Sequence, residues 1–117
     1  MNKVFISHPL SNNIELNRKR ADKVCKIINK EDDLIPISPI HLFGFFEKDK
    51  KREAILYTCY KMIDICDYVF MIIYDNNMSE GQTLEYYYAF KTNKKVIPIY
   101  LNEGEEINDN NIKWSLS

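Results

Sequence analysis

The fold is set by the stretch Tyr68-Val69-Phe70-Met71-Ile72-Ile73-Tyr74. A continuous apolar run of β-branched and aromatic residues is typical of a strand that is buried on both faces, as strands are in a parallel sheet. Ser79 and Gln82 follow this run with the spacing of a capping box, which marks the start of a helix. The sequence therefore predicts a buried strand, a short polar loop and a helix, a junction at which open α/β sheets bind ligands.

The other elements follow from hydrophobic periodicity and from turn residues on either side of this strand. We expect helices over residues 14–30, 50–66 and 80–92, and further strands over residues 4–7, 34–38 and 95–101. Pro36 interrupts the second strand, which favours a sheet edge. With right-handed crossovers, this order predicts a small doubly wound, flavodoxin- or Rossmann-like α/β fold. Its mostly parallel four-stranded sheet has the order 2-1-3-4, with helices on both faces.

The length and the charge narrow the class of protein. A chain of 117 residues is long enough for one domain with a real core, which we expect over residues 1–101, followed by a polar, mobile tail over 102–117. Sixteen basic and seventeen acidic residues are mixed along the chain, so nucleic acid is not an expected partner. No apolar run approaches the about 20 residues of a membrane helix, and the N-terminus lacks a signal-peptide core. We expect a cytoplasmic protein without a membrane partner.

The cysteines and histidines show no pattern of a metal or redox site. Cys25, Cys59 and Cys66 are odd in number, form no CxxC pair and fall in predicted helices among apolar neighbours, which indicates buried reduced thiols. His8 and His41 have no metal-ligand spacing to any cysteine. We therefore expect neither a metal nor another cofactor.

The predicted strand order also places a candidate site. Its switch point lies between the first and third strands, so the loops at residues 7–11 and 75–79 should meet in one crevice. Glu85 lies four residues after Gly81 on the same helical face, and the glycine leaves room for a ligand beside the carboxylate. The residue before a proline is held extended, so His8 is expected to face the same crevice.

Four segments together carry a family pattern: Ile6-Ser7-His8-Pro9, Ser38-Pro39-Ile40-His41-Leu42, Cys66-Asp67-Tyr68-Val69, and Ser79-Glu80-Gly81 with Glu85 and Ala89. This combination resembles the nucleoside 2-deoxyribosyltransferase-like superfamily, most closely its small bacterial and phage-borne members. The resemblance spans about residues 3–101. It implies an enzyme that breaks N-glycosidic bonds in nucleosides or nucleotides and passes the sugar to another base or to water. It also implies a homo-oligomer with sites shared between subunits.

The resemblance implies roles for single residues. Glu85 matches the glutamate that attacks the anomeric carbon, and a carboxylate can form the covalent glycosyl ester that this role requires. Asp67 matches an aspartate near the base and would be the second catalytic residue. The residues implied to bind substrate are Ser7, His8, Pro9, His41, Asp75, Ser79, Gly81 and Tyr88.

Other interpretations stay open. An aspartate at a helix–strand junction, such as Asp67, often bonds backbone amides, and Asp75 suits a turn. The loop after the first strand lacks the glycine and the arginine that 5′-monophosphate hydrolases of the superfamily carry, which leaves phosphate recognition open. The first alternative function is a non-catalytic nucleotide-binding protein, a sensor or sequestering protein for a nucleotide signal. The second is a structural role, with the aromatic loop at residues 39–46 as the interface.

Overall fold

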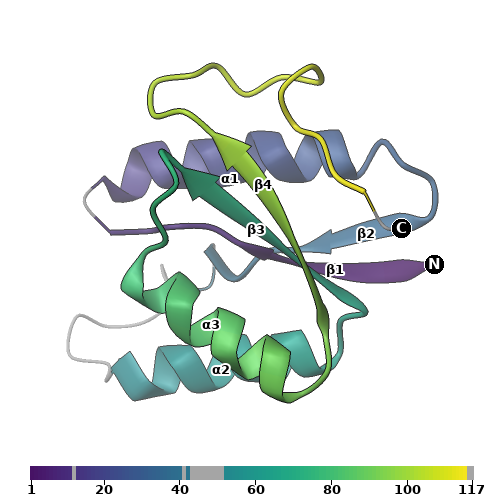
Figure 1. Ribbon diagram of the computed structural model, residues 1–117, viewed down its shortest axis with the longest axis vertical. Coiled ribbons are helices and arrows are strands. Elements are labelled where there is room, and N and C mark those ends of the chain that lie inside the picture. The colour runs from purple at the N-terminus through teal and green to yellow at the C-terminus, as the bar shows by residue number, and fades with distance from the viewer. Residues whose placement is uncertain (12, 41, 43–51, 116–117) are drawn as a thin grey trace.

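The computed structural model contains one four-stranded sheet between two helical layers (Figure 1). It describes residues 1–11, 13–40, 42 and 52–115. Along the chain the elements are β1 (Asn2–Ser7), α1 (Ile14–Ile28), β2 (Leu34–Ile37), α2 (Arg52–Asp64), β3 (Tyr68–Tyr74), α3 (Glu80–Lys91) and β4 (Lys95–Leu101). The sheet order is β2-β1-β3-β4 and each neighbouring pair is parallel, so the predicted 2-1-3-4 topology is confirmed.

The central strand β3 is buried on both faces, as its apolar run predicts. Phe70 and Ile72 join α1 in one core, while Val69 and Met71 pack with α2 and α3 in the other. Because successive side chains of a strand point to opposite faces, only a continuous apolar run fills both cores at once. Pro36 lies in the edge strand β2, as predicted.

The segment after β4 differs from the expected polar tail. It folds back over the α1 side of the sheet (Figure 1), where Ile107 and Ile112 are buried in the core. The ring of Trp114 lies 5.5 Å from that of Phe70. These apolar residues are too widely spaced among polar neighbours to show a helix or strand period, and only the tertiary fold brings them onto one surface.

The cysteines are unpaired thiols: Cys59 and Cys66 are buried and Cys25 is half-buried. In the described part of the chain, no group of three or more His, Cys, Asp or Glu side chains is arranged to hold a metal ion. Across the same residues, no helix combines the length and the apolar character that crossing a membrane requires.

Candidate active site

The carboxyl ends of β1 and β3 lie side by side, since Ser7 pairs with Met71 in the parallel ladder. Beyond β3 the chain reverses at Asp75 and Asn76, whose φ angles are 51° and 60°. The N–H of Asn77 donates to the carbonyl of Tyr74 at 2.9 Å and closes the turn. Two left-handed residues define a type I′ turn, which favours Asn and Asp. Asp75 therefore has the turn-forming role that the sequence left open, and its Oδ1 accepts from the N–H of Glu103.

The helix α3 begins with the predicted capping box. The Ser79 hydroxyl accepts from the N–H of Gln82 at 3.1 Å, and Gln82 Oε1 accepts from the N–H of Ser79 at 3.0 Å. The other end of the Gln82 amide makes contacts that sequence reasoning missed: Nε2 donates to the carbonyls of Ser7 at 3.2 Å and Ile72 at 2.6 Å. Because Gln82 is 1% exposed, it joins the start of α3 to both strands through buried hydrogen bonds.

Glu85 is a buried carboxyl group at the meeting point of three elements. It is 8% exposed, and its Oε1 accepts from the Ser7 hydroxyl of β1 at 2.7 Å. The Cys59 thiol of α2 also forms a hydrogen bond with its side chain. Burial disfavours the charged form and raises the pKa of Glu85 from 4.5 to about 7, although both hydrogen bonds pull this pKa down. Burial also raises the pKa of the Cys59 thiol, which therefore stays a neutral donor.

This carboxyl group forms part of the wall of a cavity of about 440 Å³. The other walls come from the loop after β1, including His8, from the first turn of α3, including Gly81, and from apolar side chains of α2 such as Ile55. A Cβ atom built on Gly81 would meet no described atom nearer than the Ser79 Oγ at 4.0 Å. The space beside the carboxylate is therefore open, as the glycine predicts.

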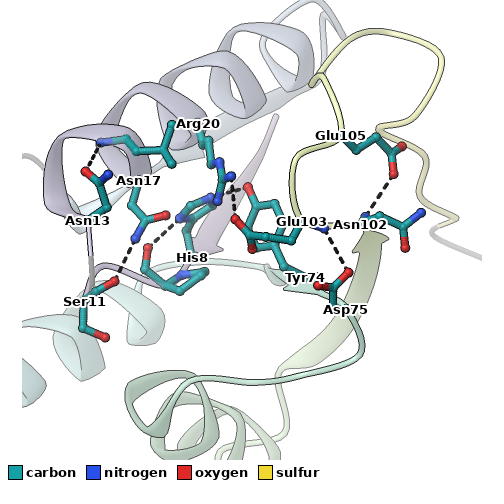
Figure 2. Close-up of polar contacts among 12 residues, drawn as sticks. His8, Ser11, Asn13, Asn17, Arg20, Tyr74, Asp75, Asn102, Glu103 and Glu105 are labelled. Atoms are coloured by element: carbon teal, nitrogen blue, oxygen red, sulfur yellow. Dashed lines mark hydrogen bonds and ion pairs between the residues drawn. The ribbon is translucent and has the colours of Figure 1, made fainter.

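The His8 ring is held by two hydrogen bonds, one at each ring nitrogen. The carbonyl of Pro9 can only accept, so at 2.7 Å it takes the Nδ1 proton of His8. Nε2 then accepts from the Tyr74 hydroxyl, also at 2.7 Å (Figure 2). Burial lowers the pKa of His8 from 6.5 to about 4, so the ring is neutral at physiological pH. His8 therefore lines the cavity as a neutral ring.

A second cavity of about 380 Å³ adjoins the first, since Ser11 and Ser79 line both. Pro9 and Asp75, which the resemblance implies as binding residues, line this second cavity. Its far wall is an ion pair at 2.6 Å between Arg20 of α1 and Glu103 (Figure 2). The Arg20 guanidinium also lies 4.8 Å from the centre of the Tyr74 ring, a cation–π contact.

Two of the described site residues that were predicted, Asp67 and Tyr88, are not brought to these cavities. Asp67 lies at the opposite end of the sheet, where its Oδ2 accepts from the N–H of Lys3 at 2.7 Å. Four residues of strand, about 13 Å, separate it from Met71, which pairs with Ser7. Tyr88 turns toward α2, where its hydroxyl donates to Asp64 at 2.5 Å. His41 lies outside the described residues.

Tyr88 misses the cavity for a geometric reason. Its side chain leaves α3 on the side that faces α2. There the ring stacks on that of Tyr60, with centroids 4.3 Å apart. Cys59 and Gln82, in contrast, belong to the site although the sequence did not single them out as site residues. Gln82 carried a partial signal as the capping-box residue, whereas Cys59 looked like any other apolar position of a helix.

Comparison with known proteins finds one matching family model and several solved structures of similar fold. A model of the family described as "Domain of unknown function (DUF7768)" matches residues 2–99. No curated protein matches the chain.

Solved structures share the fold at low sequence identity. The 2-deoxyribosyltransferase of the psychrotolerant bacterium Bacillus psychrosaccharolyticus has a TM-score of 0.65 and 22% identity, over 91% of this chain and 77% of the other. The 2-desoxiribosyltransferase of Leishmania mexicana has a TM-score of 0.67 and 16% identity, over 98% and 79%. A conserved protein of Enterococcus faecalis V583 has a TM-score of 0.71 and 18% identity, over 94% and 70%. These likenesses establish a fold shared with 2-deoxyribosyltransferases.

Proposed function

The chain belongs to the family described as "Domain of unknown function (DUF7768)", and we propose that it cleaves the N-glycosidic bond of a nucleoside or nucleotide with Glu85 as the nucleophile. One observation carries this proposal: a buried carboxyl group, bonded to the Ser7 hydroxyl at 2.7 Å, in the wall of a cavity of about 440 Å³ at the switch point of the sheet. The fold shared with two proteins described as deoxyribosyltransferases supports the reaction class.

The proposed reaction has two displacements at the anomeric carbon. In the first, a carboxylate oxygen of Glu85 bonds to that carbon, and the carbon–nitrogen bond breaks. The base leaves with the bonding electron pair and takes up a proton, and the sugar remains as an ester of Glu85. In the second, a water molecule or another base attacks the same carbon, loses a proton and releases the Glu85 carboxylate. The Ser7 hydroxyl orients the carboxylate for both steps.

The surroundings of Glu85 set its protonation. Only the ionised carboxylate is a nucleophile, and burial raises the pKa of Glu85 to about 7. We expect the rate to rise with pH through this value. A low-dielectric wall also strengthens the attraction between the carboxylate and a positively charged anomeric centre, which stabilises the transition state.

The proposed substrate contacts are those residues of the resemblance that line the two adjoining cavities: His8, Pro9, Asp75, Ser79 and Gly81. Ser7 acts through its bond to Glu85. Asp67 and Tyr88 are left out of the proposed site, because their side chains bond elsewhere. A cytoplasmic location is part of the same proposal, since the three cysteines are unpaired thiols.

A second candidate function is nucleotide binding without chemistry, as a sensor or sequestering protein. One observation favours it: with a pKa of about 7, Glu85 is protonated in about half of the molecules at neutral pH. A protonated carboxyl group is a hydrogen-bond donor and can hold a ligand without attacking it.

A chromatographic assay separates the two functions. Wild type and Glu85→Gln are incubated with a panel of nucleosides, 5′-nucleotides and dinucleotide signals, and both the free base and the protein-bound ligand are measured. Free base that only the wild type releases supports the enzyme. A ligand that is bound and recovered intact after heating supports the binding protein. If the wild type neither releases a base nor retains a ligand, both functions are wrong.

A further inference from the structure

The cavity beside Glu85 lies between the two helices α2 and α3, which run side by side on one face of the sheet (Figure 1). Two polar contacts cross from one helix to the other. At the inner contact, the Cys59 thiol bonds to Glu85. At the outer contact, Nη2 of Arg52 lies 3.1 Å from Oε1 of Glu80. Arg52 and Glu80 are the first residues of their helices, and all four residues line the cavity, which therefore extends from one contact to the other.

The two contacts differ in their exposure to water. Glu85 and Cys59 are 8% and 2% exposed, whereas the side chains of Arg52 and Glu80 are 55% and 75% exposed. The outer pair therefore lies at the mouth of the cavity, and the inner pair at its closed end. Because an ion pair this exposed contributes little to stability, either of its side chains can be replaced without loss of the fold.

The charges around the cavity favour a neutral group at its mouth. Among the described residues that line it, Arg52 is the one cation, while Glu80 and Glu85 both carry carboxyl groups. The His8 ring is neutral. A phosphate at the mouth would meet a cation that is already paired and a carboxylate that repels it. A neutral group that offers acceptors to Arg52 and donors to Glu80 meets no such repulsion.

Between the two contacts, the walls suit a flat ring. Ile55 and Leu56 of α2 line this part of the cavity with apolar side chains, and Gly81 leaves the α3 side open. Glu80 and Glu85 are five residues apart, so the helix separates them by about 7.5 Å along its axis. With an anomeric carbon at Glu85, this separation is comparable with the span of a purine from its sugar bond to its far edge. A pyrimidine ring is shorter.

The donors and acceptors of the outer pair match the edge of guanine. Guanine presents O6 and N7 as neighbouring acceptors, to which a guanidinium donates in a bidentate manner. Its N1–H and 2-amino group are neighbouring donors, which the two oxygens of one carboxylate can accept. A guanidinium has five N–H groups and a carboxylate about four lone pairs, so the contact between Arg52 and Glu80 can persist. Adenine presents one amino group between two acceptors, and these acceptors repel a carboxylate.

We propose that Arg52 and Glu80 select guanine as the base of the substrate. Arg52 donates to O6 and N7, and Glu80 accepts from N1–H and the 2-amino group. The assignment rests on the proposed function, because it places the sugar at Glu85, and it goes further by naming the base. Both side chains act on binding and take no part in breaking the glycosidic bond.

Isothermal titration calorimetry on Glu85→Gln tests base recognition apart from the reaction, because this variant lacks the nucleophile. The probes are guanosine, inosine and adenosine. We expect guanosine to bind about tenfold more tightly than inosine, which lacks the 2-amino group, and about a hundredfold more tightly than adenosine. Equal affinities for the three nucleosides, or no binding of any of them, overturn the proposal.

Substitutions in the Glu85→Gln protein assign the two contacts. Glu80→Gln introduces an amide, a group that pairs with adenine, so the preference for guanosine over adenosine should fall about tenfold and that over inosine should vanish. Arg52→Met should weaken guanosine and inosine equally, by about tenfold, because both carry O6 and N7. If Glu80→Gln keeps the original order of affinities, the assignment of Glu80 is wrong.

Asp109→Asn is the matched control for these substitutions. It removes one partner of another exposed ion pair, at 3.0 Å from Lys30, and neither residue lines the two cavities described above. All three affinities should stay unchanged in this variant. Thermal melting of each variant checks that the fold is intact.

Base release by the wild type separates this proposal from the proposed cleavage. Release at equal rates from all three nucleosides would support the cleavage and overturn the selection of guanine. Guanosine-selective binding without release of any base would have the opposite meaning, because it would support the contacts at the mouth of the cavity and overturn the cleavage.

Discussion

Two carboxyl groups that the resemblance implies as catalytic lie at opposite ends of the sheet and in opposite surroundings. At the amino end, Asp67 is exposed, and it joins β3 to β1 by accepting from the N–H of Lys3 while its own N–H donates to the carbonyl of Lys3. At the carboxyl end, Glu85 is buried, and its partners are the Ser7 hydroxyl and the Cys59 thiol. The two ends of one sheet thus use the same chemical group for different purposes.

The difference teaches that surroundings decide what a carboxyl group can do. A carboxylate that faces water beside a backbone amide keeps the strands together, and Asp67 lines neither of the two cavities described above. A carboxyl group in an apolar wall, with hydrogen-bond donors that are not backbone groups, borders a cavity and has a shifted pKa. Perturbed groups of this kind cluster at functional sites. Four measurements can break or sharpen this comparison.

The largest expected effect is on turnover. Glu85→Gln keeps the shape of the side chain but removes the nucleophile, so we expect base release to fall by on the order of 10⁴ or more. Asp67→Asn should leave turnover within about twofold of the wild-type value, an effect below 0.5 kcal/mol. The chromatographic assay measures both variants side by side. Equal losses in the two variants would mean that the comparison between the two ends is wrong.

The next effect is on stability as a function of pH. The pKa of Glu85 is about 7 in the folded protein and 4.5 as an ordinary glutamate. Between these values the folded state binds more protons than the unfolded state, so this group lowers the free energy of unfolding as the pH rises. The loss is complete above pH 7 and amounts to about 3 kcal/mol.

Urea unfolding of the wild type and of Glu85→Gln at pH 4.5 and at pH 7.5 measures this effect. We expect the variant to gain about 3 kcal/mol relative to the wild type over this interval. The difference between the two proteins is the decisive quantity, because His8 acts in the opposite direction. Its pKa is lowered to about 4, so it adds stability as the pH rises toward 6.5. A constant difference would show that the pKa of Glu85 is the same in the folded and the unfolded protein.

A smaller effect is expected from the buried amide that joins the site to the sheet. Gln82→Met leaves the carbonyls of Ser7 and Ile72 without their donor and removes half of the capping box, which should cost about 2 kcal/mol of stability. Ser79→Ala removes only the other half of the box and should cost about 1 kcal/mol. Thermal or urea unfolding of both variants gives the comparison. Equal losses of stability in the two variants would show that Gln82 contributes only as part of the helix cap.

The smallest effect belongs to the amino end of the sheet. Asp67→Asn weakens one hydrogen bond to the N–H of Lys3, and we expect a loss of about 1 kcal/mol of stability. Because the asparagine side-chain oxygen still accepts this bond, Asp67→Ala should cost more than Asp67→Asn. Urea unfolding measures both. If neither variant changes stability, the bond to Lys3 does not hold the two strands together.

Much of the architecture was predictable because it depends on local patterns. The described structure confirms three such predictions. The apolar run of β3 predicted a strand buried on both faces, the capping box at Ser79 predicted a helix start, and Pro36 predicted an edge strand. The crevice followed from topology alone, and the Ser7 and Glu85 side chains do meet across 78 positions of sequence. Their roles in catalysis stay a prediction.

The sequence by itself determined the order of the strands, the start of α3 and the end of the sheet at which Glu85 lies, since periodicity, capping and the handedness of crossovers act over short distances. The tertiary structure alone decided which side chains meet. In the folded chain Tyr88 bonds to Asp64 of α2, and Asp67 bonds to the N–H of Lys3. The Gln82 amide bonds to two strands, and Ile107 is buried in the core. Such contacts depend on the packing of elements that are distant along the chain, and no local pattern of residues records that packing.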